Sequence, residues 1–85
     1  MFDCQLEIEL KLNHKFEKVK PKNFSNFIDA KESLKLMYNE YIEKWKKNKI
    51  FYDSNGVFCY VFDREHGNEF KARIKDNPKK DKKDE

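Results

Sequence analysis

Apolar and polar residues alternate strictly at the start of the chain, over residues 2–12. The even positions, from Phe2 to Leu12, are all apolar, and the odd positions between them are all polar. A helix would spread this two-residue repeat around its circumference, whereas a strand places successive side chains on opposite faces. The pattern therefore predicts a long amphipathic strand with one face on a core and the other in water.

A basic connector follows over residues 14–22. Its scattered apolar residues, Phe16 and Val19, set no clear period, so the connector either extends the first strand or turns back as a short second one. Pro21 predicts that regular structure ends by about Lys20, because proline has no N–H to donate to a sheet.

The next segment has a helical period. Apolar residues recur at steps of three and four, which indicates the buried stripe of an amphipathic helix over about residues 26–48. Ser25 or Asn26 can cap its start, and Asn48 can terminate it. The stripe consists of Phe27, Ala30, Leu34, Met37, Tyr38, Tyr41 and Trp45.

Residues 50–53 and 57–62 predict a hairpin, because Asn55 and Gly56 between them suit the positive φ angles of a type I′ turn. In residues 57–62 both alternating sets of side chains are apolar. This strand is therefore either covered on both faces or presents one aromatic face for binding. The favoured interpretation places the aromatic set in the core, namely Phe58, Tyr60 and Phe62.

Residues 69–75 alternate again, which predicts a last strand. The predicted order β-α-β-β-β defines an α+β fold: a small antiparallel sheet of about four strands with one long amphipathic helix packed on one face. We expect residues 1–75 to form a single domain. The charged tail, residues 76–85, lacks the apolar side chains of a core and is expected to be disordered.

Charge narrows the functional classes only slightly. The 85 residues carry a net charge of +3, and residues 11–49 hold eleven lysines against five acids, a local surplus of +6. Such a surplus can bind a polyanion. Nucleic-acid-binding domains commonly show a stronger imbalance and more arginine, so a solvated surface is the favoured interpretation. Abundant lysine, asparagine and phenylalanine are typical of an AT-rich genome, such as that of a low-GC bacterium or its phages.

The chain shows no signal for export or for a membrane. It does not begin with a basic segment followed by an apolar run, and no apolar stretch approaches the roughly 18 residues that span a bilayer. We therefore expect a cytoplasmic protein. Cys4 and Cys59 both occupy strand positions, so we expect buried thiols, with a disulfide between them as the alternative.

Catalytic and metal-binding patterns are weak. The three serines follow no nucleophile motif, and a packed, protonated thiol explains Cys59 better than a catalytic pair with His66. These two residues with Cys4 and His14 lack the close ligand spacing of a zinc site. We therefore expect no enzyme activity, no cofactor and no bound metal.

The first candidate binding surface lies on the predicted helix. Leu36 falls opposite the buried stripe, within an acidic ring. An exposed apolar residue with a polar rim is typical of protein docking, and the acids can also imitate the phosphates of a nucleic acid. The ring consists of Asp29, Glu32, Glu40 and Glu43.

The second and third candidate surfaces carry bases. On the predicted strands, Phe58 and Tyr60 combine with Lys71 and Arg73, and aromatic side chains beside bases can stack single-stranded nucleic acid. The third surface combines the basic connector, residues 11–22, with the lysine-rich end of the helix, which would meet only if the connector folds back along the helix. The lysines at the helix end are Lys44, Lys46, Lys47 and Lys49.

The sequence thus favours a small non-enzymatic protein-binding module, an inhibitor or adaptor of phage or mobile-element type that docks on a host protein. Leu36 with its acidic ring is the preferred contact, followed by Phe58 and Tyr60. One alternative is a nucleic-acid-binding domain that uses the helix-end lysines with Lys71 and Arg73. The other is a structural homodimer that pairs through an exposed edge of the first strand.

Overall fold

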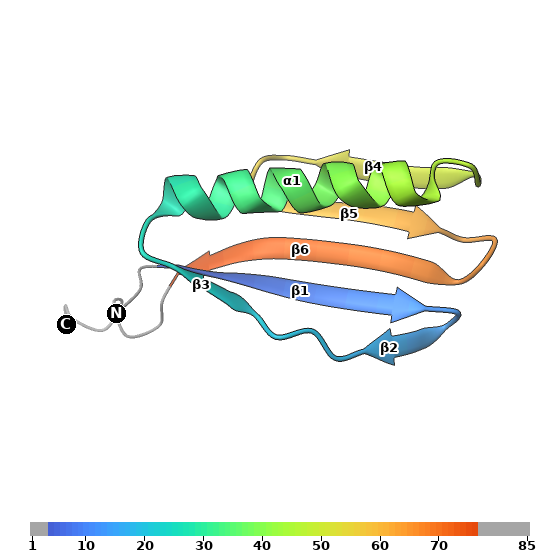
Figure 1. Cartoon of the computed structure of the whole chain (residues 1–85), viewed down its shortest axis with the longest axis horizontal. Helices are drawn as coiled ribbons and strands as arrows, with labels where there is room; N and C mark the ends of the chain where they lie inside the picture. Colours follow the sequence, from blue (N-terminus) through green and yellow to red (C-terminus); the bar gives the residue numbers. More distant parts are fainter. Residues whose placement is uncertain (1–3, 77–85) are drawn as a thin grey trace.

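The computed structural model describes residues 4–76, which form an antiparallel sheet with one helix across one face (Figure 1). The α+β class and the single long helix agree with the sequence prediction, but the sheet has six strands rather than about four. Phe2 and residues 77–85 of the predicted tail lie outside the described residues, whereas Asp76, which the prediction placed in the tail, ends the last strand. The elements are β1 (Cys4–Leu12), β2 (Lys15–Glu17), β3 (Lys22–Phe24), α1 (Phe27–Trp45), β4 (Ile50–Ser54), β5 (Phe58–Asp63) and β6 (Asn68–Asp76).

The strands are arranged in the order β2-β1-β6-β5-β4, with β3 beside β1 on the same side as β2. β1 pairs with β6 along nearly its whole length. On its other side, β2 pairs with the last residues of β1 and β3 with the first. Most of the edge that the sequence left exposed on the first strand is therefore covered, and only residues 7–9 of β1 lack a strand partner on that side.

The two unpredicted strands lie in the basic connector, which turns back rather than extending β1. Asn13 and His14 have φ angles of 53° and 69°, and two left-handed residues between paired strands are typical of a type I′ turn. Regular structure does not end by Lys20, since β3 follows Pro21 directly. Proline at a strand start loses no ladder hydrogen bond, which explains why β3 tolerates it.

The helix is shorter than predicted and begins at a defined cap. The Asn26 side-chain oxygen accepts a hydrogen bond from the Asp29 N–H at 2.8 Å, which selects Asn26 over Ser25 as the cap. The helix ends at Trp45, so Asn48 does not terminate it. Phe27 is the one exposed member of the predicted stripe, at 44 %.

The β4–β5 hairpin has a different turn from the predicted one. The Asn55 N–H donates to the Phe58 carbonyl oxygen at 3.0 Å, so the central residues are Gly56 and Val57. Gly56 has a φ of 93°, whereas Asn55 has no positive φ. A positive φ at the first central position alone is typical of a type II′ turn rather than type I′.

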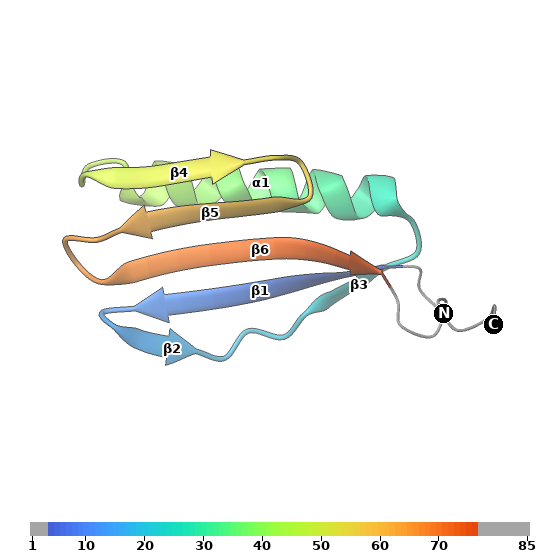
Figure 2. The ribbon, with the colours of Figure 1, turned by 180° about the vertical axis from the view of Figure 1, so that it is seen from behind.

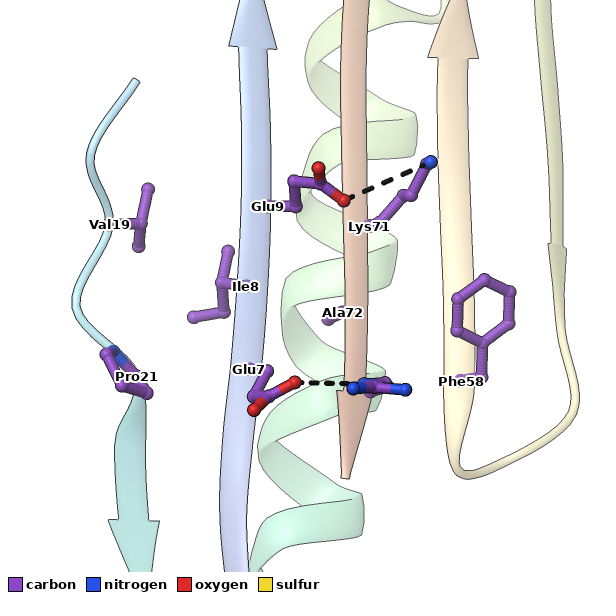
Figure 3. Close-up of a pocket in the computed structure, with 9 residues that line it drawn as sticks. Glu7, Ile8, Glu9, Val19, Pro21, Phe58, Lys71 and Ala72 are labelled. Atoms are coloured by element: carbon purple, nitrogen blue, oxygen red, sulfur yellow. Dashed lines mark hydrogen bonds and ion pairs between the residues drawn. The ribbon is translucent and has the colours of Figure 1, made fainter. Parts of the chain in front are cut away.

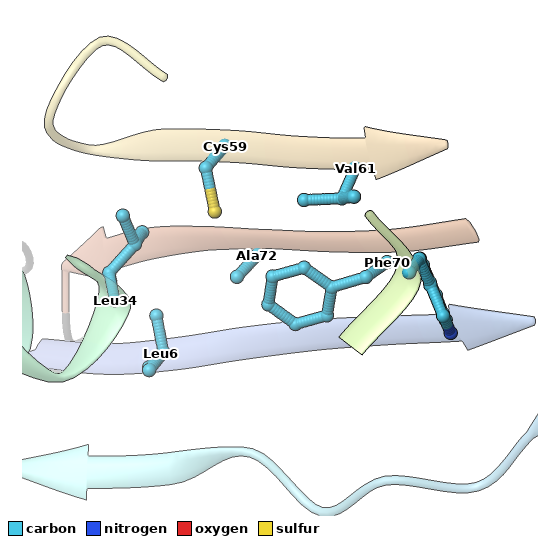
Figure 4. Packing of buried hydrophobic residues seen from close by; sticks show 7 residues of the cluster. Leu6, Leu34, Cys59, Val61, Phe70 and Ala72 are labelled. Carbon is cyan, nitrogen blue, oxygen red and sulfur yellow. The ribbon is translucent and has the colours of Figure 1, made fainter. Parts of the chain in front are cut away.

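The core fills the space between α1 and the sheet (Figure 4). Tyr41 of the helix stacks on Phe70 of β6, with ring centroids 4.3 Å apart. Within residues 4–76, no helix is both long and apolar enough to cross a membrane. The buried cluster comprises Leu6, Leu34, Trp45, Cys59, Val61, Phe70 and Ala72.

Candidate functional site

The sheet face opposite the helix is open, and Figure 2 shows its strands with α1 behind them. Along β5, burial alternates: Cys59, Val61 and Asp63 are buried beneath the helix, so the intervening rings lie on the open face. The interpretation that these rings form the core is therefore wrong. The helix supplies its own rings to the core, and small side chains on β5 leave room for them. The rings on the open face are Phe58, Tyr60 and Phe62.

These rings form a continuous row. The centroids of Phe58 and Tyr60 are 6.2 Å apart, and those of Tyr60 and Phe62 are 4.7 Å apart. Phe51 of β4 lies directly across from Phe62 and is 54 % exposed, while Phe58 is 37 % exposed. We call Phe51, Phe58, Tyr60 and Phe62 the ring ladder.

Beside the ring ladder, opposite charges alternate between β1 and β6. The Arg73 Nε donates to a Glu7 carboxylate oxygen at 2.9 Å, and the Lys75 Nζ lies 3.4 Å from the other. The hydrogen bond from Arg73 holds the pKa of Glu7 below its usual value, and the charge of Lys75 acts in the same direction. We call this set the charged ladder; its other pairs are Lys71–Glu9 at 4.0 Å and Lys11–Glu69 at 3.6 Å.

A shallow groove of about 480 Å³ runs over the charged ladder (Figure 3). Val19 and Pro21 of the connector line one side, and Phe58 of the ring ladder lines the other. The Glu7–Arg73 and Glu9–Lys71 pairs lie between these walls. The open face therefore combines an aromatic strip with a grooved strip of paired charges.

The predicted helix contact lies on the other side of the molecule. Leu36 is 66 % exposed, and its acidic ring of Asp29, Glu32, Glu40 and Glu43 is exposed as well. Two of these acids already have partners, because Asp29 accepts a hydrogen bond from Asn26 and Glu43 pairs with Lys46 at 3.0 Å. Leu36 points away from the sheet, so one small partner cannot cover it together with Phe58 and Tyr60.

The six bases of the nucleic-acid alternative do not share one surface. Lys71 and Arg73 lie on the open face, each beside a carboxylate. The other four lie at the C-terminal end of α1: Lys44 is in its last turn, and Lys46, Lys47 and Lys49 follow it in the chain.

Sequence reasoning missed a polar cluster around Asp63. This carboxylate is fully buried and accepts hydrogen bonds from the Asn48 and Asn68 side chains at 2.8 and 3.2 Å. His66 Nδ1 lies 3.1 Å from one of its oxygens, so His66 contacts Asp63. The cluster joins the exit of α1 to the β5–β6 turn.

The Asp63 cluster has a structural role rather than a metal-binding one. Asp63, Glu65 and His66 have ligand atoms close enough to hold a metal ion, but the Asp63 oxygens are already acceptors for three side chains. The only trace of this cluster in the sequence is that an acid, Asp63, follows Cys59 and Val61 on the helix-facing side of β5. That trace becomes readable only once the inward face of β5 is known.

Comparisons with protein-family models, curated proteins and solved structures found no match to this chain.

Proposed function

We propose that the protein is a non-enzymatic binding module that docks a protein partner on the open face of its sheet. The observation that carries this proposal is the ring ladder, which lies on the surface although the chain has a core in which rings could be buried. Aromatic side chains supply large contact areas at protein interfaces, and they cluster at the centre of such contacts.

The charges on this face favour a protein over a nucleic acid. The open-face strand positions hold four acids and four bases, and each of the four bases lies within 4.0 Å of a carboxylate oxygen. Nucleic-acid affinity depends on releasing counterions to an excess of positive charge, and a balanced face supplies no such excess. The acids are Glu7, Glu9, Asp53 and Glu69, and the bases are Lys11, Lys71, Arg73 and Lys75.

The groove supports the same proposal. Exposed ion pairs contribute about 0–1 kcal/mol each, so the pairs on its floor can exchange partners with charged groups of a bound protein at little cost. Paired charges beside apolar area are typical of the rim of a protein interface.

Affinity capture with matched variants tests the proposal. The full chain is immobilised as wild type, as Phe58→Glu and as Leu36→Glu, and exposed to lysate of the source cells with and without nuclease. Both substitutions place a charge at an exposed apolar position, one on the open face and one on the helix. Equal urea midpoints for the three proteins establish that they fold alike.

We expect wild type and Leu36→Glu to retain the same protein, and Phe58→Glu to lose it at least about tenfold, which corresponds to about 1.4 kcal/mol. Nuclease treatment should leave this retention unchanged. Loss in Leu36→Glu alone would move the contact to the helix. Retention of nucleic acid, with every captured protein lost on digestion, would contradict a protein-binding module.

A further inference from the structure

The outer edge of β4 has features that favour pairing with a further strand, and the other edge of the sheet lacks them. On the far side, β2 and β3 are only three residues long and are interrupted by Pro21. Short strands, lysines and proline are the usual protection against edge pairing. β4 has instead three uncharged residues, Ile50, Phe51 and Tyr52, and the last two are 54 % and 51 % exposed.

The hydrogen-bond pattern shows which backbone groups of β4 face outward. The Asn55 N–H bonds to the Phe58 carbonyl, and bonded pairs alternate along an antiparallel ladder. Phe51 and Asp53 therefore direct their backbone groups toward β5, and Ile50, Tyr52 and Ser54 direct theirs outward. The Ser54 N–H already bonds to the Asp53 carboxylate at 2.8 Å, which leaves Ile50 and Tyr52 as the residues available for pairing.

We propose that β4 pairs antiparallel with β4 of a second copy of this chain, with Phe51 on the two-fold axis. In this register Ile50 of each copy exchanges both backbone hydrogen bonds with Tyr52 of the other. The register that centres on Tyr52 instead would need the Ser54 N–H, which is already engaged.

Charge complementarity selects the same register. With Phe51 on the axis, Lys49 of each copy lies opposite Asp53 of the other, and the pair occurs twice. Within residues 4–76, neither Lys49 nor Asp53 forms an ion pair in the single chain. The row from Phe62 to Phe51 would then continue across the axis, so that the ring ladders of two copies form one aromatic face. This inference does not depend on the protein partner proposed above.

Disulfide trapping tests the position of the axis. Directly opposed residues of a non-hydrogen-bonded pair have Cα atoms about 4.5 Å apart, within the range of about 4.4–6.8 Å that a disulfide spans. Phe51→Cys should therefore oxidise to a covalent dimer at micromolar concentration. Phe16→Cys is the matched control, because Phe16 is an exposed phenylalanine of the opposite edge. Equal trapping of both variants, or of neither, would overturn the proposal.

A charge swap tests the register. Sedimentation equilibrium in about 0.15 M salt should show wild type approaching twice its 10.4 kDa chain mass. Lys49→Asp and Asp53→Lys should each raise the dimer Kd about tenfold, and the double variant should return it to within about threefold. A wild-type chain that stays monomeric to about 0.5 mM would overturn the proposal. A dimer whose Kd is the same in wild type and in the single charge variants would overturn the proposal as well.

Discussion

Replacing Asp63 with asparagine is expected to destabilise the protein by about 2–4 kcal/mol. The carboxylate is fully buried and accepts from Asn48, His66 and Asn68. An asparagine side chain has nearly the same shape, but its NH2 group would face donors where the carboxylate oxygens accept. The substitution therefore removes charge-assisted bonds without creating a cavity.

The magnitude follows from these contacts. A hydrogen bond to a charged group contributes about 1.5–3 kcal/mol, and a buried donor left unsatisfied costs about 1–3 kcal/mol. Asparagine can keep one of the acceptor contacts, so the loss of one or two bonds sets the expected range. For a domain of this size, with a urea m value of about 1 kcal/mol/M, the unfolding midpoint should fall by about 2 M or more.

Urea unfolding at 25 °C, followed by the fluorescence of the single tryptophan, Trp45, measures the effect. Trp45 is buried against the sheet, so its emission should shift on unfolding. Glu65→Gln is the control, because it neutralises an exposed carboxylate of the same turn and should change stability by no more than about 0.5 kcal/mol. Equal midpoints for Asp63→Asn and Glu65→Gln would refute a structural role for the Asp63 cluster.

The same variant has a defined pH dependence. Burial would raise the pKa of Asp63, but hydrogen bonds from His66 and Asn48 and the charge of His66 outweigh burial and hold this pKa below its ordinary 3.8. A carboxyl with a lowered pKa in the folded state stabilises the protein fully above its ordinary pKa, and this contribution is lost as the pH falls through the lowered value. The stability difference between wild type and Asp63→Asn should therefore be largest near neutral pH and shrink below about pH 4. A constant difference across this range would contradict the argument.

Three further predictions concern local structure. Gly67→Ala should lower the free energy of unfolding by more than about 2 kcal/mol, because φ is +69° and a Cβ would lie 2.4 Å from the His14 ring. Adding His14→Ala should recover the part of this loss that comes from the clash but not the part that comes from backbone strain, and thermal unfolding of both variants measures the two parts. Burial raises the pKa of the Cys59 thiol to about 11. Near pH 8 a thiol-alkylating reagent should therefore modify Cys59 about 100-fold more slowly in the folded chain than in urea, as measured by peptide mass spectrometry. Comparable alkylation rates would contradict the burial of Cys59. Asn26→Ala should cost about 1 kcal/mol and Ser25→Ala much less, because Asn26 alone caps α1; equal urea midpoints would contradict this assignment.

Long periodic segments could be predicted from the sequence, and short ones could not. The alternation in β1 extends over nine described residues, and the stripe of α1 extends over five turns, so each pattern has one interpretation. β2 and β3 have three residues each, too few to show a period. They form because the left-handed Asn13 and His14 return the chain alongside β1, which already presents backbone groups for pairing.

The face of β5 could not be predicted because both of its alternating sets are apolar. Large rings are usually buried, and this expectation led to the wrong face. The choice depends on what the opposing layer supplies: α1 brings Tyr38, Tyr41 and Trp45 to the core, so β5 contributes the small Cys59 and Val61. Volume complementarity between two layers is a tertiary property that neither segment contains alone.

Among the candidate site residues, exposure could be predicted better than proximity. The helical period placed Leu36 on the exposed side of α1, where the structure has it. It gave no indication that Phe58 and Tyr60 lie on the opposite side of the molecule. The pairing of Lys71 and Arg73 with acids of β1 depends on strand order, which joins residues more than sixty positions apart.

The most direct test of the central claim is site-specific photo-crosslinking in the source cells. A photo-reactive phenylalanine analogue replaces Phe58 in one version of the full chain and Leu36 in another, and the cells are irradiated before lysis. We predict a discrete adduct with a second protein from position 58 and none from position 36. Adducts from position 36 alone, or adducts to nucleic acid alone, would contradict the proposal that the open face of the sheet binds a protein.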